Sequence, residues 1–156
     1  MKVIITITES ALPIARTIQR EWLDAEVVRM SDKTFLTEHW KELECVVFVG
    51  AMGICVRTIA PLLNDKYTDP AVICVDSTGK YVIPVVSGHI GGANDYSKRI
   101  AAILGGEAII TTQSDNLGLW AIDTLAQKYG WQTEVDHTRM NLFVYQFVEK
   151  KPTALL

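Results

Sequence analysis

Cysteine is scarce in this sequence of 156 residues, which contains only Cys45, Cys55 and Cys74. The number is odd, the surroundings are apolar, and no pair has C-x-x-C spacing. Neither a disulfide framework nor a zinc site is therefore expected. We predict buried, reduced thiols, as is typical of cysteine in a cytosolic protein.

Long hydrophobic runs and a basic excess are missing as well. No apolar stretch is long enough to cross a bilayer, and the start of the chain lacks the hydrophobic core of a signal peptide. The formal net charge is −3, and no basic stripe stands out, which argues against a general nucleic-acid surface. We expect a cytoplasmic protein that binds neither membranes nor nucleic acid.

Several motifs of common enzyme classes do not occur. The phosphate loop G-x-x-x-x-G-K-[ST] is absent, and the first strand-to-helix turn, at residues 8–10, lacks the dinucleotide fingerprint G-x-G-x-x-G. Neither G-x-S-x-G nor H-E-x-x-H is present. A nucleotide-phosphate domain therefore remains only a weak alternative, which a titration with ATP or NAD would test.

What the sequence does contain is an alternation of short apolar strands and amphipathic helices. Hydrophobic residues make up 49% of the chain and charged residues 21%, as in a globular domain with one main core. The pattern predicts an α/β fold with three αβα layers around a mostly parallel, Rossmann-like sheet that contains one antiparallel strand. Strands are expected at residues 3–8, 26–29, 45–49, 71–76, 81–86 and 107–111.

Helices are expected between these strands. Ser10 is predicted to cap the first helix, and Ser31 or Asp32 to begin the second. The predicted helices cover residues 10–22, 31–43, 54–63, 93–104 and 117–129, followed by an amphipathic segment at 140–149. The last residues, 150–156, look like the start of a strand, which predicts a fragment of a longer protein.

The direction of the strand at residues 71–76 decides where the loops meet. Its turn to residues 81–86 is short and makes these two strands antiparallel if they pair directly. If residues 71–76 run parallel to residues 45–49, the loops after 45–49 and 81–86 end on opposite edges of the sheet. If the connector 64–70 runs back across the sheet, both loops reach the same edge. We expect the second arrangement, because ligands in open α/β sheets gather at the carboxyl ends of the parallel strands.

The loop at residues 87–94 joins a strand to a helix and contains three glycines and His89. Glycine brings backbone N–H groups close to a ligand, and a helix start adds unpaired donors and a partial positive charge. Such a joint suits an anion. An alternative is that the glycines only permit a tight turn and that His89 is a solvated loop residue.

Two further loops have related chemistry, at residues 50–53 and 111–116. We place Arg57 in the first turn of its helix, where it is positioned to clamp a carboxylate; alternatively, it is a surface arginine paired with Asp65 or Asp69. In the third loop Asp115, or Ser114, is either a helix cap or a site residue. Together the three loops offer backbone donors, a cation, an imidazole and a carboxylate.

Short motifs follow one another in a characteristic order, at residues 53–61, 65–66, 69–72, 87–94, 110–112 and 115. In this order they resemble the N-terminal region of the CbiG family of cobalamin-biosynthesis proteins, the cobalt-precorrin-5A hydrolases. The resemblance implies a CbiG N-terminal-like α/β domain at residues 1–130, followed at 131–156 by a linker and the truncated start of the family's middle region. Gln113 and Ser114 depart from the family's usual alanine and threonine.

This resemblance implies a hydrolase of the anaerobic route to vitamin B12. Such an enzyme opens the δ-lactone of cobalt-precorrin-5A and releases acetaldehyde to give cobalt-precorrin-5B. Cobalt is carried by the substrate, so no cofactor and no metal site in the protein are implied. The implied partners are the cobalt-corrinoid intermediate and the missing middle and C-terminal CbiG regions, and homo-oligomer formation is left open.

The macrocycle carries many carboxylates, which helix starts, glycine loops and Arg57 can bind. We predict that His89 and Asp115 are catalytic, with His89 as general base or acid and donors near Gly91 stabilising an oxyanion. The predicted substrate-binding residues are Gly50, Gly53, Arg57, Ser87, Gly88, Gly91, Gly92, Asn94, Thr111 and Thr112. The alternative is a non-catalytic module that holds corrinoid carboxylates while the absent C-terminal part performs the chemistry. The prediction of one joint site requires His89, Arg57 and Asp115 to face a common cleft.

Overall fold

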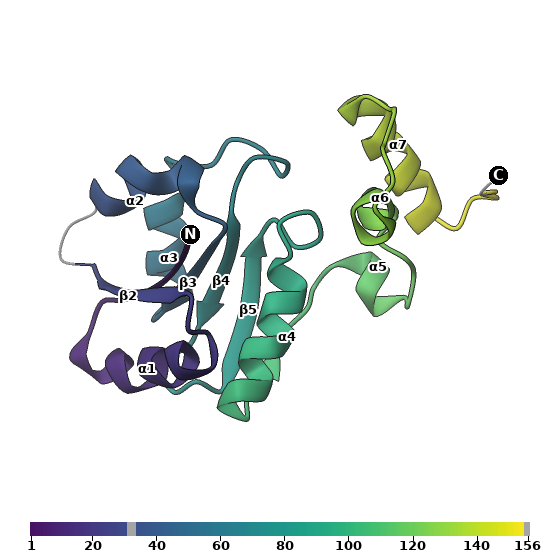
Figure 1. Ribbon diagram of the computed structural model, residues 1–156. Helices are drawn as coiled ribbons and strands as arrows, with labels where there is room; N and C mark the ends of the chain where they lie inside the picture. The colour runs from purple at the N-terminus through teal and green to yellow at the C-terminus, as the bar shows by residue number, and fades with distance from the viewer. Residues whose placement is uncertain (31–33, 155–156) are drawn as a thin grey trace. The chain divides into compact units, whose positions relative to one another are not determined.

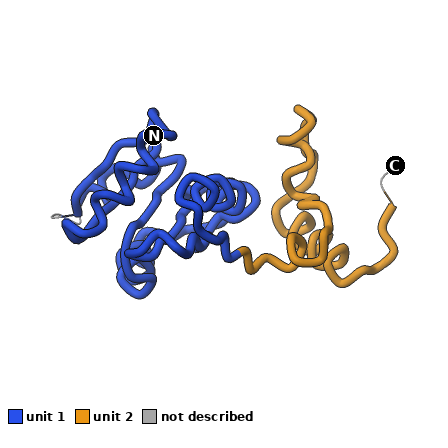
Figure 2. The backbone as a smooth tube through the Cα atoms, turned by 90° about the horizontal axis from the view of Figure 1, so that it is seen from below, with its two compact units in different colours: residues 1–109 blue, residues 110–156 orange. Residues whose placement is uncertain are grey.

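The computed structural model describes residues 1–30 and 34–154 and divides the chain into two compact units, Met1–Ile109 and Ile110–Leu156 (Figure 2). The predicted helix start at Ser31 or Asp32 lies outside the described residues. The division between the units precedes the domain boundary expected at residue 130, and that assignment stays a prediction. Within the described ranges, every helix is too short or too polar to span a bilayer.

A six-stranded sheet in the order β2-β1-β3-β4-β5-β6 forms the centre of the larger unit (Figure 1). All residues of β3 and β4 are buried, as expected for β-branched strands that are covered on both faces. The strands are β1 (Lys2–Thr6), β2 (Ala25–Arg29), β3 (Cys45–Val49), β4 (Ala71–Val75), β5 (Tyr81–Val86) and β6 (Glu107–Ala108).

Helices cover both faces of the sheet, so the predicted three-layer α/β fold is confirmed. Helices α1 (Leu12–Glu21) and α4 (Ala93–Leu104) pack on one face, and α2 (Thr34–His39) and α3 (Met52–Ile59) pack on the other (Figure 1). The 3-10 segments η1 (Glu9–Ala11) and η2 (Trp40–Glu42) precede α1 and follow α2. Ser10 lies within η1 and does not cap α1, because the helix begins only at Leu12.

The direction of β4 differs from the expectation. Strand β4 is parallel to β3 and antiparallel to β5, and β5 is parallel to the short β6. The prediction of residues 71–76 as a lone antiparallel strand is therefore wrong, and β5 with β6 runs opposite to the other four strands. The reason is that α3 already returns the chain to the amino ends of the strands, so that no further crossing by the connector is needed.

The described part of the smaller unit consists of helices joined by irregular segments. The helix expected at residues 117–129 forms only in its second part, which ends at Tyr129 and is closed by Gly130 as predicted; residues 117–121 are not helical, and Gly118 among them has a left-handed φ of 65°. The helical elements of the smaller unit are α5 (Gln113–Asn116), η3 (Ile122–Thr124), α6 (Leu125–Tyr129) and α7 (His137–Val148). Asp136 caps α7 by accepting a hydrogen bond of 2.9 Å from the Arg139 N–H. Residues 151–154 form no strand, and residues 155–156 lie outside the described part.

Candidate functional site

The two glycine loops of the larger unit lie at opposite edges of the sheet. Residues 50–53 follow β3 at the carboxyl edge, where the Gly50 N–H donates to the carbonyl at the end of β4 (2.8 Å). The loop after β5 reaches the amino edge, where the Ser87 hydroxyl donates to the carbonyl of Asp69, just before β4 (3.0 Å). The expectation that both loops reach one edge is wrong, because β4 is parallel to β3. The sheet therefore separates His89 from the carboxyl-edge loop.

The amino-edge loop satisfies several of its own backbone donors. The bonds run from Gly92 N to His89 O (3.0 Å), from Ala93 N to Ser87 O (3.1 Å) and from Asn94 N to Gly88 O (3.0 Å). A group that already donates within the protein is less available to a developing oxyanion. The donors expected near Gly91 and Gly92 are thus partly used by the turn itself.

Close packing accounts for two glycines of this loop. A Cβ at Gly91 would lie 2.6 Å from the Ser87 Cβ and 2.9 Å from the Ser87 carbonyl oxygen. A Cβ at Gly88 would lie 2.8 Å from Oδ1 of Asn94. Ser87 itself has a φ of 56°, a left-handed conformation that is strained for serine. The tight-turn interpretation therefore explains Gly88 and Gly91, and their substrate-binding role stays a prediction.

The carboxyl-edge turn presents free backbone donors. Helix α3 begins at Met52, and its cap residue Ala51 is extended and makes no side-chain cap. Within residues 1–30 and 34–154, the N–H groups of Ala51, Met52 and Gly53 have no acceptor from the protein. Unpaired N–H groups at a helix start carry partial positive charge and bind carboxylates or phosphates.

Arg57 lies in the last turn of α3, and not in the first as expected, because the helix starts at Met52. Its side chain nevertheless reaches back to the helix start. A Cβ at Gly53 would lie 3.4 Å from Nη1 and 3.8 Å from Nη2 of Arg57. Residues four apart share one face of a helix, and their side chains tilt towards its N-terminus.

The guanidinium of Arg57 has no counterion in the part of the chain that the structure describes. The alternative pairing with Asp65 or Asp69 is not observed: the Asp69 carboxylate accepts from the Trp40 indole N–H (3.1 Å) and from the Asn64 N–H (2.9 Å). A cation beside the positive end of a helix is unfavourable unless an anion joins it. The arrangement is therefore suited to an anionic ligand.

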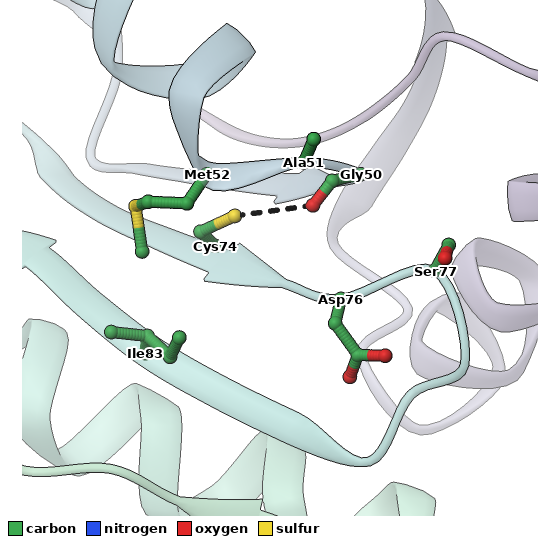
Figure 3. Close-up of a pocket in the computed structure, with 7 residues that line it drawn as sticks. All are labelled: Gly50, Ala51, Met52, Cys74, Asp76, Ser77 and Ile83. Atoms are coloured by element: carbon green, nitrogen blue, oxygen red, sulfur yellow. Dashed lines mark hydrogen bonds between the residues drawn. The ribbon is translucent and has the colours of Figure 1, made fainter.

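A pocket of about 180 Å³ adjoins this turn (Figure 3). Its walls come from the ends of β3 and β4, the start of α3 and the facing strand β5: Gly50, Ala51, Met52, Cys74, Asp76, Ser77 and Ile83. The Cys74 thiol donates to the Gly50 carbonyl (3.4 Å), as the dashed line in Figure 3 marks. The lining is mostly apolar, and the space suits a short substituent and not a whole macrocycle.

The ionisable groups around the pocket have shifted pKa values. Burial by itself would raise the pKa of Asp76, but hydrogen bonds from the Thr78 hydroxyl and from backbone N–H groups outweigh it and hold the pKa below its ordinary value. Cys55 lies outside the lining but contacts the lining residue Cys74, and this contact raises the pKa of Cys55 and lowers the pKa of Cys74. A carboxylate with a lowered pKa is a poor general base near pH 7. The chemistry of this edge therefore favours binding over proton transfer.

Thr111, Thr112 and Asp115 belong to the smaller unit. The Thr112 hydroxyl donates to Oδ2 of Asp115 (2.7 Å), which brings two predicted site residues together. Ser114 and Asp115 lie inside α5 and Thr112 occupies the cap position, so neither Ser114 nor Asp115 is the helix cap. Their roles at a site stay predictions. Within residues 1–30 and 34–154, no three His, Cys, Asp or Glu side chains are grouped to hold a metal ion.

Of the pocket residues, only Gly50 was predicted, and the sequence analysis missed Ala51, Met52, Cys74, Asp76, Ser77 and Ile83. Met52 follows a glycine turn and Asp76 directly follows a strand, and both are positions typical of ligand sites in parallel sheets. The signal was therefore present in the sequence. Asp76 was not recognised because β4 was expected to run in the opposite direction, which would have placed Asp76 at the other edge.

Comparison with known families gives a direct match. The family model "Cobalamin synthesis G N-terminal" matches residues 34–115, and "Cobalamin biosynthesis central region" matches residues 120–156. The chain belongs to the CbiG family. The first match contains both glycine loops of the larger unit and Arg57, so the resemblance predicted from the sequence is confirmed.

Individual CbiG relatives agree with this assignment. The cobalt-precorrin-5A hydrolase of Salmonella typhimurium is 49% identical over 81 residues, which are 52% of this chain and 23% of that protein. The cobalt-precorrin-5A hydrolase of Priestia megaterium is 33% identical over 149 residues, which are 84% of this chain and 40% of that protein. This chain thus spans less than half the length of either relative.

A solved structure in the same family has the same architecture. The crystal structure of a cobalamin biosynthesis protein G homolog from Sulfolobus solfataricus matches with a TM-score of 0.64 and 26% identity. The match covers 96% of this chain and 46% of that chain. The α/β arrangement of the CbiG N-terminal region is therefore shared with a solved relative.

Proposed function

We propose that this chain is the N-terminal part of a cobalt-precorrin-5A hydrolase. The reaction opens the δ-lactone of cobalt-precorrin-5A and releases acetaldehyde to give cobalt-precorrin-5B in anaerobic cobalamin biosynthesis. Membership of the CbiG family and two relatives that carry this enzyme name support the proposal. The remaining parts of such an enzyme would be supplied by the middle and C-terminal CbiG regions.

Within that enzyme, the carboxyl edge of this region binds a carboxylate of the corrinoid. The observation that carries this proposal is the guanidinium of Arg57, which lies against Gly53 beside unused N–H groups and has no counterion among the described residues. A substrate carboxylate placed there accepts charge-assisted hydrogen bonds from both sources. The apolar pocket beside the turn would take a short substituent of the same macrocycle.

The separation of His89 from Arg57 favours the binding role over a complete catalytic site in the larger unit. His89 follows β5, whereas Arg57 and the pocket lie where β3 and β4 end. A single substituent of the substrate therefore does not meet both residues. A non-catalytic corrinoid-carboxylate module is thus the second candidate, and acetaldehyde release distinguishes it from the first.

Replacing Arg57 by glutamine is expected to weaken the binding of cobalt-precorrin-5A to the chain by about 10- to 100-fold. The reason is the loss of charge-assisted hydrogen bonds to the carboxylate. Equilibrium dialysis with absorbance detection of the corrinoid measures the affinity. Arg20→Gln, on the exposed side of α1, is the matched control and should bind like the wild type. Equal affinities for the Arg57→Gln variant and the wild type would contradict the carboxylate site.

Acetaldehyde release separates catalysis from binding alone. With saturating cobalt-precorrin-5A, the binding role predicts that the isolated chain releases no acetaldehyde, although it binds the substrate. In the full-length enzyme, a proton-transferring His89 predicts a loss of about 100- to 10,000-fold in rate on His89→Ala. A full-length His89→Ala variant that releases acetaldehyde at the wild-type rate would remove His89 from the mechanism.

A further inference from the structure

We infer that Gly53 is a positioning residue, which holds the guanidinium of Arg57 at the start of α3. The inference rests on the carboxylate-binding function proposed above and adds a residue that acts through another. Gly53 and Arg57 are four residues apart on the exposed side of the helix. At this spacing the longer side chain lies over the earlier residue.

The geometry at Gly53 is specific to the guanidinium. A Cβ built there would have three nearest heavy-atom neighbours, all in Arg57: Nη1 at 3.4 Å, Nη2 at 3.8 Å and Cζ at 3.9 Å. The Nη edge of the guanidinium therefore lies nearest to the position that a side chain of residue 53 would occupy. A methyl group would just touch it, whereas a longer side chain would occupy its place.

Neither backbone strain nor crowding by neighbouring backbone requires a glycine at this position. Gly53 does not have a positive φ, so the backbone conformation is open to any residue. Outside its own helix, the three atoms nearest to its Cβ position are all side-chain atoms, unlike at Gly106, where a Cβ would meet the Gly79 carbonyl oxygen at 2.6 Å. Glycine inside a helix is destabilising relative to other residues. The contact with the Arg57 guanidinium is the feature of this structure that accounts for a glycine at position 53.

The contact between Arg57 and Gly53 reduces the cost of ordering the arginine side chain when a ligand binds. A free arginine side chain samples many rotamers, and ordering it on binding reduces the affinity. At Gly53 the guanidinium lies against the first turn of α3, the turn in which the N–H groups of Ala51 and Met52 are unused, so that cation and donors can bind the same carboxylate. Arg57 supplies the charge, and Gly53 determines where the charge lies.

The test is the substitution Gly53→Leu in the chain, alone and combined with Arg57→Gln. Alone it is expected to weaken cobalt-precorrin-5A binding by about 5- to 10-fold, and Gly53→Ala by about twofold, because preorganisation is lost stepwise. The melting temperature should not fall, since leucine and alanine favour the helix. In the Arg57→Gln background, Gly53→Leu should cause no further loss. If Gly53→Leu weakens binding in the Arg57→Gln background as much as it does alone, the inference is overturned. Ala60→Leu, at the far end of α3, is the control and should bind like the wild type.

A measurement without substrate keeps this test separate from the proposed function. In ¹⁵N-labelled protein, the Arg57 Nε–H signal, assigned by its absence in Arg57→Gln, should show restricted motion in the wild type. It should show free motion in Gly53→Leu. If the wild type fails to bind the corrinoid, the proposed function fails and the mobility of Arg57 still decides the role of Gly53. If the mobility of the Arg57 side chain is the same in Gly53→Leu and in the wild type, Gly53 does not position the guanidinium.

Discussion

Replacing Gly91 by alanine is expected to lower the free energy of unfolding of the larger unit by about 3 kcal/mol, at the upper end of typical overpacking costs. The new Cβ would lie 2.6 Å from the Ser87 Cβ, 2.9 Å from the Ser87 carbonyl oxygen and 3.3 Å from the Ala71 N. Backbone atoms cannot rotate away as a flexible side chain can. The loop must therefore move off the start of β4, and the hydrogen bond from Ser87 to Asp69 is put at risk.

Two comparison variants make this result specific. Gly105→Ala, at the other end of α4, meets no atom within 4 Å and carries only the strain of a φ of 65°, so a smaller loss of about 1–2 kcal/mol is expected. Ser87→Gly combined with Gly91→Ala should recover part of the loss, since glycine relieves both the contact and the φ of 56°. Urea unfolding followed by tryptophan fluorescence measures all three. Equal losses for Gly91→Ala and Gly105→Ala would contradict the role of packing.

Replacing Asp76 by asparagine is expected to lower the free energy of unfolding by about 2–3 kcal/mol at pH 7, because hydrogen bonds to a charged acceptor are lost. The Asp76 carboxylate accepts from the Thr78 N–H (2.8 Å), the Thr78 hydroxyl (2.5 Å) and the Tyr81 N–H (2.6 Å). An asparagine has one acceptor oxygen and would turn an NH₂ group towards a donor. The turn that reverses the chain between β4 and β5 is therefore weakened.

The wild type and the Asp76→Asn variant should also differ in how their free energy of unfolding depends on pH. The hydrogen bonds hold the pKa of Asp76 below its ordinary value of 3.8 in the folded state. A lowered pKa contributes stability that is present above the unfolded-state pKa and is lost as the pH falls through the folded-state pKa. The stability difference between wild type and Asp76→Asn should thus be full at pH 7 and shrink below about pH 4. Glu26→Gln on β2 is the control, and a difference that stays constant down to pH 2 would refute this account.

The position of the pocket agrees with a general property of open α/β sheets. Ligands bind outside the carboxyl ends of parallel strands, where the loops can diverge from one another. The pocket, the free N–H groups of α3 and Arg57 all occur at that edge. The amino-edge loop with His89 is instead closed by its own hydrogen bonds. The two edges of the sheet are therefore separate regions of the larger unit.

The sequence by itself determined the elements whose signals are local. Strands β3 and β5 and helix α4 have the bounds that the pattern predicted, because β-branched runs and a glycine at each helix end are read within a few residues. The order of short motifs likewise determined the CbiG family before any geometry was known. The helix expected at residues 117–129 was correct only in its second part, since residues 117–121, which include the left-handed Gly118, are not helical.

Only the tertiary structure decided which loops lie together. Residues 64–70 are compatible with either direction of β4, because a connector's length and composition do not specify its path. Once α3 packs antiparallel to β3, the chain is already back at the amino edge, β4 must run parallel to β3, and the Asp76 turn reverses β5. This packing separates His89 from Arg57. The tertiary structure also decides the pocket and the contact of the Arg57 guanidinium with Gly53, which depend on distances between residues that no local pattern contains.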